Sequence, residues 1–478
     1  MKKVILLALL FLSVSFPQIS LYKLNFYCEE YAKKKTLPSV SAGLMEKDKI
    51  VWTAYVGSID LENNIPATKN SLYRVASISK SITAVAVMQL VEQGKIKLDS
   101  SARYYLPYLP HKKWHFTVRQ LLSHTSGIRS YKNEEEFNSK VTFKSVRDAV
   151  LYIGKDSLEY QPGTKYLYST LAYNLLAGII EQVSGISYET YLQKNIFDPL
   201  KMTSTKLDFY NKIIPNRAKG YQKNSLREFE NSPIADLTIK LPGGGVLSTV
   251  EDLLKFSNGL LQNKLIKKQT LDSMLTETTL LNGTKIQYGL GLNFGFDKYG
   301  KKFYGHSGGG TGFISQFLCY PDLNLASVYL INCRDRNLIN IAEETAALYT
   351  GTDIAFPKFS LSDTLTKITT AVSIDSALAF WTDIEKKKDE KFLISNDEKK
   401  DFGYDLLNSN RAKDAILAFT KLAETDTTFS AGFVGLGEAF NLDGNKGLAL
   451  RSFKKAQKLK PNDPQIQTMI LQTEKDLK

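Results

Sequence analysis

The sequence has few of the residues that build disulfide frameworks or metal centres: three cysteines and four histidines among 478 residues. An odd cysteine count provides no disulfide framework. Cys319 and Cys333 lie in apolar, strand-like runs, so we expect them to pack as small hydrophobic residues. Cys28 is not preceded by the small residues that accompany a lipid-modified cysteine. We therefore expect a free protein of the periplasmic type, with an acyl anchor at Cys28 as the alternative.

Common motifs of metal and nucleotide sites are absent as well. There is no His-Glu-x-x-His, and the glycines at 243–245 lack the Lys-Ser/Thr ending of a phosphate loop. His111 and His115 are four residues apart, but they follow a proline and no carboxylate or cysteine completes a site. We expect these two histidines to be solvated or to cap a turn. The sequence thus predicts no metal and no cofactor.

The charge balance does not indicate a nucleic-acid partner. The formal net charge is +13, but the lysines are spread along the whole chain and no nucleic-acid motif is present. Scattered lysines are typical of a solvated surface rather than of a binding patch. We predict a small-molecule or peptide substrate and no nucleic acid.

Long apolar runs are missing too, since spanning a bilayer takes ~20 apolar residues. Two lysines precede the shorter apolar run Val4–Val14, and Ser13 and Ser15 offer small residues at a cleavage site. This layout predicts a secretory signal peptide over residues 1–15. We therefore expect an exported protein, periplasmic or secreted, with no transmembrane helix in the mature chain.

Strand-like runs at both ends of a long segment enclose several helical ones. Val40–Leu44 and Ile50–Tyr55 flank a charged turn and predict a hairpin, and Tyr288–Cys333 predicts several antiparallel strands. This order predicts an α/β domain over residues 21–352, with a sheet built from both chain ends and covered by helices. The helices are expected near 21–35, 77–93, 169–183 and 247–261, the last with Ser248 or Thr249 as its cap.

After residue 352 the character of the sequence changes. Residues 353–395 predict a helical, charged linker, and residues 396–470 predict a small all-α segment of tetratricopeptide-like repeats. Such a pair of repeats would pack on the main domain or on the preceding helices, and it could engage a protein partner. The second copy carries Phe433, Leu436, Gly437, Phe440, Ala449, Phe453, Ala456 and Pro461, and the partial first copy carries Phe402, Gly403, Leu406, Ala415 and Phe419.

Residues 77–80 read Ser-Ile-Ser-Lys at the start of the first long helix. Residues three apart share a helix face, so the Ser77 hydroxyl and the Lys80 amine can meet. An amine can activate a serine nucleophile if burial lowers its pKa. The same pattern also begins at Ser20 and at Ser452, and a helix N-cap is the alternative role of Ser77. The pattern alone leaves the role of Ser77 open.

Further motifs accompany this serine in a characteristic order. They read YRVASISK at 73–80, LLSHTSGI at 121–128, PGT at 162–164 with YS at 168–169, GGG at 243–245 through DL at 252–253, YGLG at 288–291 and GHSGG at 305–309. With them, residues 39–332 resemble the serine β-lactamase and penicillin-binding protein superfamily, in the branch of class C β-lactamases, D-alanyl-D-alanine carboxypeptidases and family VIII esterases. The resemblance implies an antiparallel sheet flanked by helices, with a helical subdomain.

The resemblance also implies a set of catalytic residues. Ser77 resembles the acylated nucleophile and Lys80 its paired amine. Tyr168 resembles the tyrosine of the Tyr-x-Asn element, which shares proton transfer with the lysine, and nearby ammonium groups would help its phenol to lose a proton. The only literal Tyr-x-Asn begins at Tyr131, in a charged, loop-like stretch, and we rank it below Tyr168.

Thr170 departs from the pattern, because the family often has Asn at this substrate-binding position. Threonine lacks the two-pronged hydrogen bonding of an amide, so the substitution weakens the case for tight binding of peptides or β-lactams. His124, in the Ser-His-Thr-Ser-Gly stretch, is expected to be structural and to hold a turn through bonds between its side chain and the backbone.

His306 resembles the first residue of the family's third element, Lys-Thr-Gly or His-x-Gly. The resemblance implies that His306 orients the Tyr168 hydroxyl and contacts the substrate. Gly308 and Gly309 would let the backbone approach the substrate closely. The N–H groups of Ser77 and Gly309 would then form the oxyanion hole.

Two functional hypotheses follow. The first is a metal-independent hydrolase in which the substrate acylates Ser77 and water releases the acyl group; a D-amino-acid peptide, a β-lactam or a small ester would serve. The His-x-Gly element and Thr170 favour a peptidase or esterase over a dedicated antibiotic-hydrolysing enzyme. The alternative is a non-catalytic envelope binding protein that keeps the cleft and engages a partner through its repeats.

Overall fold

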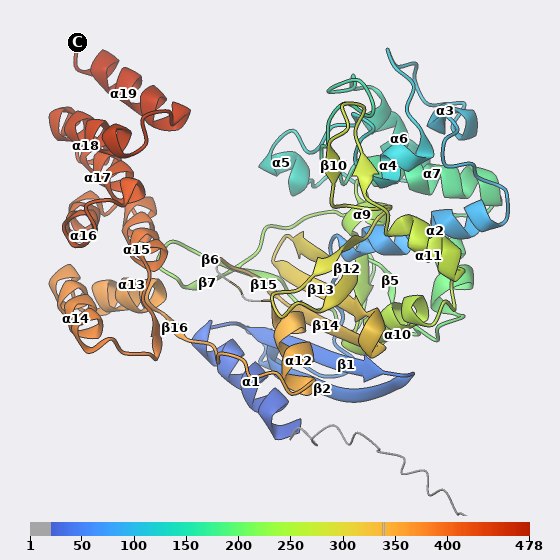
Figure 1. The fold of residues 1–478 in the computed structure, drawn as a ribbon, viewed down its shortest axis with the longest axis horizontal. Helices are drawn as coiled ribbons and strands as arrows, with labels where there is room; N and C mark the ends of the chain where they lie inside the picture. Colours follow the sequence, from blue (N-terminus) through green and yellow to red (C-terminus); the bar gives the residue numbers. More distant parts are fainter. Residues whose placement is uncertain (1–20, 337, 339) are drawn as a thin grey trace, which may run out of the picture.

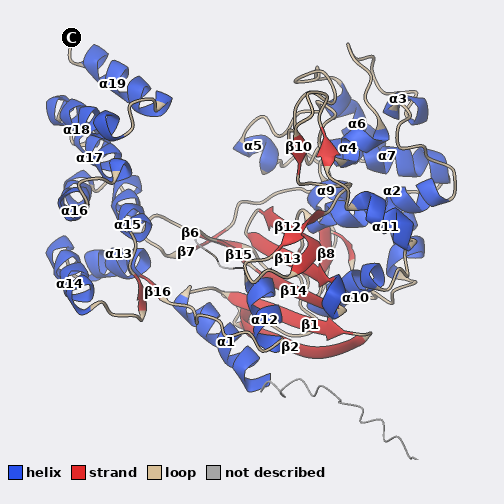
Figure 2. Ribbon diagram, in the orientation of Figure 1, coloured by secondary structure: helices blue, strands red, loops and turns tan. Residues whose placement is uncertain are grey.

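The computed structural model describes residues 21–336, 338 and 340–478. Its centre is a seven-stranded antiparallel sheet in the order β11-β12-β13-β14-β1-β2-β3 (Figures 1 and 2). The predicted signal peptide, residues 1–15, lies outside the described residues. The strands are β1 (Ser39–Glu46), β2 (Lys49–Asp60), β3 (Ile65–Pro66), β11 (Asn293–Phe296), β12 (Lys302–Gly310), β13 (Phe313–Tyr320) and β14 (Leu325–Ile331).

The two ends of the domain meet in the middle of this sheet. β1 pairs with β2 on one side and with β14 on the other, in a register that places Val40 opposite Ile331. Lys47 and Asp48 connect β1 to β2 with φ of 46° and 67°, which is the backbone of a tight hairpin turn. The predicted hairpin and the predicted assembly of the sheet from both chain ends are confirmed.

Helices cover both faces of the sheet. The amphipathic helix α1 (Leu21–Lys34) and α12 (Ile341–Tyr349) pack on one face, and α10 (Val250–Leu261) packs on the other (Figure 1). The predicted mixed α/β fold is confirmed. Cys28, Cys319 and Cys333 are all buried, free thiols, and Cys28 has the packing of a core residue rather than of an anchor site.

The predicted helix cap at Thr249 is confirmed, although the range predicted for this helix began too early, at Leu247. Leu247 belongs to β8 (Val246–Ser248), and the helix begins at Val250, where the Thr249 side chain accepts a hydrogen bond from the Asp252 N–H. An apolar residue next to a helix cap fits either structure, and here the strand pairing of β8 with β4 and β5 prevails.

A helical subdomain lies beside the sheet and surrounds α2 (Ile78–Glu92). Most of α2 is buried, because it is apolar around its whole circumference. Its main neighbour, α7 (Ala172–Ser184), begins three positions later than predicted and ends at Gly185, whose φ is 73°. The other helices of this region are α3 (Ala102–Tyr105), α4 (Val118–Leu122), α5 (Glu134–Phe137), α6 (Val146–Gly154), α8 (Tyr188–Leu192), η1 (Gln193–Phe197), α9 (Leu241–Gly244) and α11 (Lys268–Met274).

Short strands complete the sheet domain, by which we mean residues 21–352. They are β4 (Tyr73–Arg74), β5 (Lys206–Leu207), β6 (Tyr221–Lys223), β7 (Phe229–Asn231), β9 (Thr278–Thr279), β10 (Lys285–Ile286) and β15 (Cys333–Arg334). Of these, β6 and β7 form a hairpin that extends toward the C-terminal helices (Figure 1). None of the described helices has both the length and the apolar character needed to cross a bilayer.

The residues from 361 onward form a helical tail that extends away from the sheet (Figures 1 and 2). In it, Gly403 and Gly435 both face the ring of Phe419, where an added Cβ would lie within 2.5 Å of ring atoms. These glycines therefore let neighbouring helices approach closely; their assignment to tetratricopeptide-like repeats stays a prediction. The tail comprises α13 (Leu361–Ala371), α14 (Ile374–Lys387), α15 (Asn396–Asn408), α16 (Ala412–Thr425), α17 (Ser430–Leu442), α18 (Lys446–Leu459) and α19 (Pro464–Asp476), with β16 (Phe359–Ser360) paired to β17 (Phe392–Leu393).

Buried ion pairs connect the tail to the sheet domain. From the β6–β7 hairpin, Lys223 lies 2.8 Å from Asp335 and 3.1 Å from Asp363, and Arg227 lies 2.6 Å and 2.7 Å from the same two aspartates. All four side chains are buried, and none is more than 11% exposed. Each cation thus lies between two carboxylates, one from each part of the chain.

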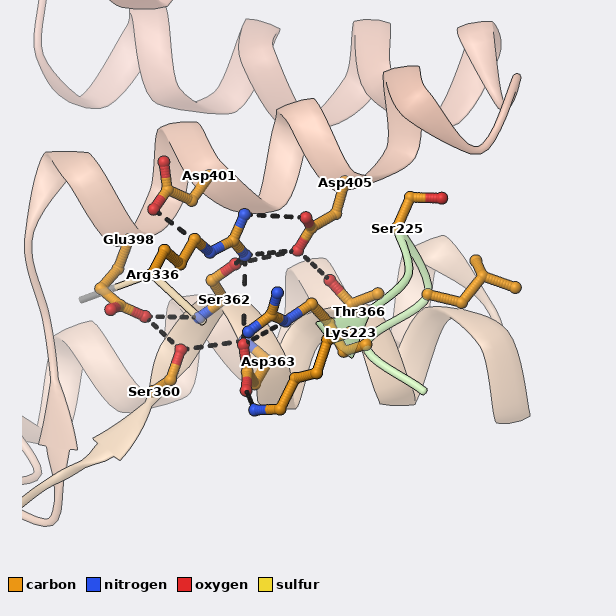
Figure 3. Close-up of polar contacts among 12 residues, drawn as sticks. Lys223, Ser225, Arg336, Ser360, Ser362, Asp363, Thr366, Glu398, Asp401 and Asp405 are labelled. Carbon is orange, nitrogen blue, oxygen red and sulfur yellow. Dashed lines mark hydrogen bonds and ion pairs between the residues drawn. The ribbon is translucent and has the colours of Figure 1, made fainter. Parts of the chain in front are cut away.

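Arg336 extends this interdomain network to α15. Its guanidinium lies 2.6 Å from Asp405 and 3.4 Å from Asp401, and it donates a hydrogen bond to the Ser362 hydroxyl (Figure 3). Ser225 from the hairpin meets Ser409 at 2.9 Å. Polar contacts from two elements of the sheet domain therefore position the tail.

Candidate active site

Ser77 lies at the N-terminus of α2, directly after a strained residue. Ala76 has a φ of 44°, a left-handed conformation that is uncommon for a residue with a Cβ. Ser77 makes no capping hydrogen bond with its side chain; instead its Oγ lies 2.9 Å from Lys80 Nζ. The geometry therefore argues against a simple N-cap role for Ser77.

Of the other two Ser-x-x-Lys patterns, the one that the structure describes, at Ser452, gives no second pair of this kind. Ser452 donates its hydroxyl to the Leu448 carbonyl at 3.0 Å, and Lys455 instead lies over the ring of Phe433. Ser20 lies outside the described residues. The pair at Ser77 and Lys80 is thus distinguished by its geometry, which the pattern could not show.

Lys80 is completely buried and has no acidic partner among the described residues. Its Nζ lies 2.9 Å from Ser77 Oγ, 3.0 Å from Thr170 Oγ1 and 2.7 Å from the Gly243 carbonyl oxygen. Burial lowers the pKa of Lys80 well below its usual value, and the nearby charge of Lys240 lowers it further. As an ammonium group, Lys80 donates to all three oxygens; after losing one proton it can still donate to Thr170 and Gly243 while its lone pair accepts the proton of the Ser77 hydroxyl.

Tyr168 contacts the same pair. The ring centroid of Tyr168 is 4.7 Å from Lys80 Nζ, and its hydroxyl is hydrogen-bonded to the Ser77 side chain. The expectation that this phenol loses its proton easily was wrong, because burial raises the pKa of Tyr168. Tyr168 therefore keeps its proton beside Ser77.

His306 lies behind Tyr168 but is directed elsewhere. Its Nε2 is 3.0 Å from the Tyr288 hydroxyl and its Nδ1 is 2.6 Å from the Ser307 carbonyl oxygen, so the expectation that it orients the Tyr168 hydroxyl was wrong. Burial, with a contribution from Lys80, lowers the pKa of His306 to about 3. The imidazole is neutral, and its Nδ1–H donates to the carbonyl.

A directed chain of hydrogen bonds links His306 to His124. The His124 Nδ1 accepts from the Ser169 N–H at 3.1 Å, which leaves the proton on Nε2, 3.3 Å from the Tyr288 hydroxyl. Tyr288 then donates to His306. The predicted role of His124 in holding a turn is confirmed by its bond to Ser169, and its ring also packs 4.3 Å from that of Tyr168. The chain fixes the wall behind Tyr168 without any charge.

The side chain of Thr170 is hydrogen-bonded to the amine of Lys80. Its hydroxyl accepts from Lys80 and is hydrogen-bonded to Tyr131, while the residue also lines the cavity in front of Ser77. Thus Tyr131, which we ranked low, belongs to the site as a neighbour of Thr170. The role of Thr170 in substrate binding stays a prediction.

The glycines of β12 face the nucleophile. An added Cβ at Gly308 would lie 2.3 Å from the Val75 carbonyl oxygen and 2.3 Å from Ser315 Oγ, whereas Gly309 has no heavy atom within 4 Å of that position. Gly308 is therefore required for close packing, and Gly309 leaves space in front of Ser77. The oxyanion hole at the N–H groups of Ser77 and Gly309 stays a prediction.

Several of these site residues border a small cavity of about 30 Å³. Besides Ser77, Thr170 and Gly309, its wall includes Arg74, Tyr131 and Lys240. Sequence reasoning did not identify Arg74 and Lys240, because single basic residues outside a motif give no signal among 62 lysines and arginines. In the described part of the chain, no cluster of three His, Cys, Asp or Glu side chains is arranged to bind a metal.

A comparison with known protein families matches residues 27–351 to the family described as beta-lactamase. The chain belongs to the β-lactamase family. The match covers the sheet domain almost completely and ends before the helical tail. It contains Ser77, Lys80, Tyr168 and His306, so the superfamily suggested by the sequence motifs is confirmed.

Curated relatives of this family agree with the assignment. The chain is 32% identical over 292 residues to the human mitochondrial serine beta-lactamase-like protein LACTB, covering 47% of this chain and 53% of that protein. It is 28% identical over 304 residues to penicillin-binding protein 4* of Bacillus subtilis, covering 60% of this chain and 66% of that protein. The chain spans about half the length of the LACTB relatives that it matches.

Solved structures share the same fold. A penicillin-binding protein homologue from Pyrococcus abyssi, described as octameric, superposes with a TM-score of 0.60 at 25% identity, covering 74% of this chain and 82% of that one. A D-stereospecific amidohydrolase from Streptomyces gives a TM-score of 0.57 at 25% identity, covering 70% and 99%. A penicillin-binding protein homologue and a D-stereospecific amidohydrolase therefore share the fold of this chain.

Proposed function

We propose that this β-lactamase family member is a serine hydrolase that forms an acyl-enzyme on Ser77. The observation that carries the proposal is the distance of 2.9 Å between Ser77 Oγ and a buried lysine amine that has no acidic partner in the described structure. A serine hydroxyl becomes an effective nucleophile when a positioned base takes its proton. Lys80 is in contact with the hydroxyl, and its lowered pKa favours the unprotonated amine that such a base requires.

The acylation step follows from these contacts. Lys80 takes the proton of Ser77 as the oxygen attacks the acyl carbon, and the resulting tetrahedral adduct collapses when the bond to the leaving group breaks. Tyr168, which keeps its proton, donates it to the departing group and is reprotonated from Lys80. Water then attacks the acyl-enzyme with the same groups in reverse roles and releases the acid and free Ser77.

For the substrate, we propose a D-amino-acid peptide or a small ester, with β-lactams turned over slowly. The likeness to a D-stereospecific amidohydrolase and to penicillin-binding proteins supports an amide or ester of this kind. The neutral His306 supports a site unlike that of lactamases with a Lys-Thr-Gly element. We further propose that the protein acts outside the cytoplasm, since residues 1–15 have the pattern of a signal peptide.

The test is covalent labelling of the full chain with a fluorophosphonate probe and, separately, with a labelled penicillin. We expect strong fluorophosphonate labelling that disappears in Ser77→Ala and persists in Ser452→Ala, which removes the serine of the other described Ser-x-x-Lys pattern. Penicillin labelling should be weak or slow. Labelling that is absent, or that persists in Ser77→Ala, would overturn the proposal and favour a non-catalytic binding protein.

A further inference from the structure

A second buried lysine, Lys240, shares the cavity wall with Ser77. The residue is 5% exposed. Its ammonium lies 4.1 Å from the ring centroid of Phe137 and 5.2 Å from that of Tyr131, and it donates to the Phe137 carbonyl oxygen. This environment holds the side chain in one place beside the nucleophile.

Lys240 has no carboxylate to balance its charge. Among the described residues no Asp or Glu lies within ion-pair distance of it, and the cavity wall contains no acidic residue. The other cation of the wall, Arg74, is already paired with Asp208 at 2.7 Å. An ammonium group has three donors, and only one of those of Lys240 has an acceptor in the described structure.

His306 on β12, which does not line the cavity, contributes no positive charge to its wall. Its two ring nitrogens are occupied by Tyr288 and by the Ser307 carbonyl. Lys240 is therefore the cation of the cavity wall that is available to pair with an anionic group entering the cavity. Burying a cation is costly unless it is paired, so a bound carboxylate would supply the missing partner.

We propose that Lys240 is a specificity-determining residue that binds a carboxylate of the substrate. The proposal rests on the proposed hydrolase function and adds the substrate class: amides or esters that carry a free carboxylate within reach of Ser77. Burial, helped by the charge of Arg74, lowers the pKa of Lys240 to about 7, as expected for a buried cation that awaits its counter-ion.

Lys240 is also connected to the catalytic lysine. It directly precedes α9, whose Gly243 carbonyl holds the Lys80 amine, and its charge contributes to the low pKa of Lys80. The segment from Lys240 to Gly243 thus contributes both to the proposed recognition of the substrate and to the position of Lys80. A substitution that removes only the charge at 240 should affect carboxylate recognition more than the reaction itself.

The experiment compares matched esters on the full chain. One pair places the carboxylate on the leaving group (4-acetoxybenzoate and its methyl ester), and the other places it on the acyl group (mono-4-nitrophenyl adipate and its methyl ester). We expect kcat/KM to favour the free carboxylate at least tenfold in one pair, after correction for spontaneous hydrolysis. In Lys240→Met this preference, taken as the ratio of kcat/KM for the free carboxylate to that for its methyl ester within the same variant, should fall at least tenfold through KM.

Two further variants keep the result interpretable. Lys240→Arg, which retains the charge, should keep most of the preference, and Lys155→Met, which removes an exposed lysine, should change nothing. Turnover of the neutral esters without any carboxylate preference in the wild type overturns the role of Lys240 alone. Absence of turnover together with absence of Ser77 labelling overturns the proposed function itself.

Discussion

Two groups of buried cations in this molecule differ in what surrounds them. In the interdomain network, Lys223 and Arg227 each lie between two aspartates. Around the cavity, Lys80 and Lys240 have hydroxyl, carbonyl and aromatic neighbours but no acidic partner among the described residues. The two groups are similarly buried, so the difference lies in their counter-charges.

The counter-charges decide the protonation of each group. Burial opposes the charge of Arg227, but its two aspartates prevail and raise its pKa; Lys223 and Arg227 likewise hold the pKa of Asp363 below its usual value against the effect of burial. Without such partners, burial lowers the pKa of Lys80 and of Lys240. Paired buried charges serve attachment of the tail, and unpaired ones are available for chemistry.

The largest expected effect is that of Lys80→Met. Because this variant removes the base, we expect fluorophosphonate labelling of Ser77 to slow by at least ~10³-fold. Stability should be unchanged or higher, since an uncompensated buried amine is lost. Labelling rates and thermal unfolding measure the two effects, and a variant that is strongly destabilised would show that Lys80 is chiefly structural.

A large loss of stability is expected from Asp363→Asn in the interdomain network. The change leaves Lys223 and Arg227 with Asp335 alone, and breaking a buried pair costs ~3–5 kcal/mol. We expect urea unfolding and limited proteolysis to show a loosened tail, with Ser77 labelling retained. In the wild type this contribution is present above the usual aspartate pKa of 3.8 and is lost as the pH falls through the lower pKa of the folded state.

The control for that variant is Asp383→Asn on the exposed face of the tail. Asp383 pairs with Lys387 at 2.7 Å, and both side chains are about half exposed or more. An exposed pair of this kind contributes ~0.3–0.5 kcal/mol. Equal effects of the two variants would refute the claim that burial distinguishes the interdomain network.

We expect Lys240→Met to change the stability less than Asp363→Asn does, and to raise it rather than lower it. The folded pKa of about 7 lies below the usual 10.5, so unfolding takes up a proton between these values and the wild type gains stability as the pH rises. At pH 7 we expect the methionine variant to be more stable by ~1 kcal/mol, or ~2–4 °C in Tm, with the gain shrinking toward pH 10.

The charged groups around Lys240 enter this prediction as well. Burial and the charge of Arg74 lower the pKa of Lys240, while Glu134 raises it. Equilibrium unfolding from pH 6 to pH 10 checks the sign. A methionine variant that is less stable than the wild type throughout this range would mean that the contacts of Lys240 with Phe137 outweigh its lack of a counter-ion.

The smallest expected effect concerns Thr170. In Thr170→Val one N–H group of Lys80 loses its acceptor, and a buried hydrogen bond is worth ~1 kcal/mol, so labelling of Ser77 should slow ~5-fold. Thr170→Ser keeps the hydroxyl and should stay within twofold of the wild type. A valine variant as fast as the serine variant would remove Thr170 from the catalytic arrangement.

Much of the fold could be predicted because local patterns dominate there. The hairpin at residues 39–60 follows from its alternation and its charged turn, and the end of α7 follows from Gly185. The cap of α10 at Thr249 could be predicted, but the strand at Leu247 was missed, because only the pairing of β8 with β4 and β5 shows it. Long-range pairing of this kind leaves no trace in a short window of sequence.

The site was predictable where the residues form motifs and not where they act singly. The motifs brought Ser77, Lys80 and Tyr168 together before any geometry was known. The partner of His306 and the protonation of Tyr168 depend on distances and burial, which a motif does not contain. Lys240 was missed for the same reason. It stands out only because it is buried and no carboxylate of the described structure lies within ion-pair distance of its amine.

The most direct test of the central claim is the pH dependence of Ser77 labelling by the fluorophosphonate probe, measured in Lys240→Met so that the titration of Lys240 does not contribute. If Lys80 is unprotonated at neutral pH because it lacks a counter-charge, the labelling rate should change less than about threefold between pH 7 and pH 9.5. A rate that rises ~10-fold per pH unit toward the usual lysine pKa of 10.5 would contradict the account.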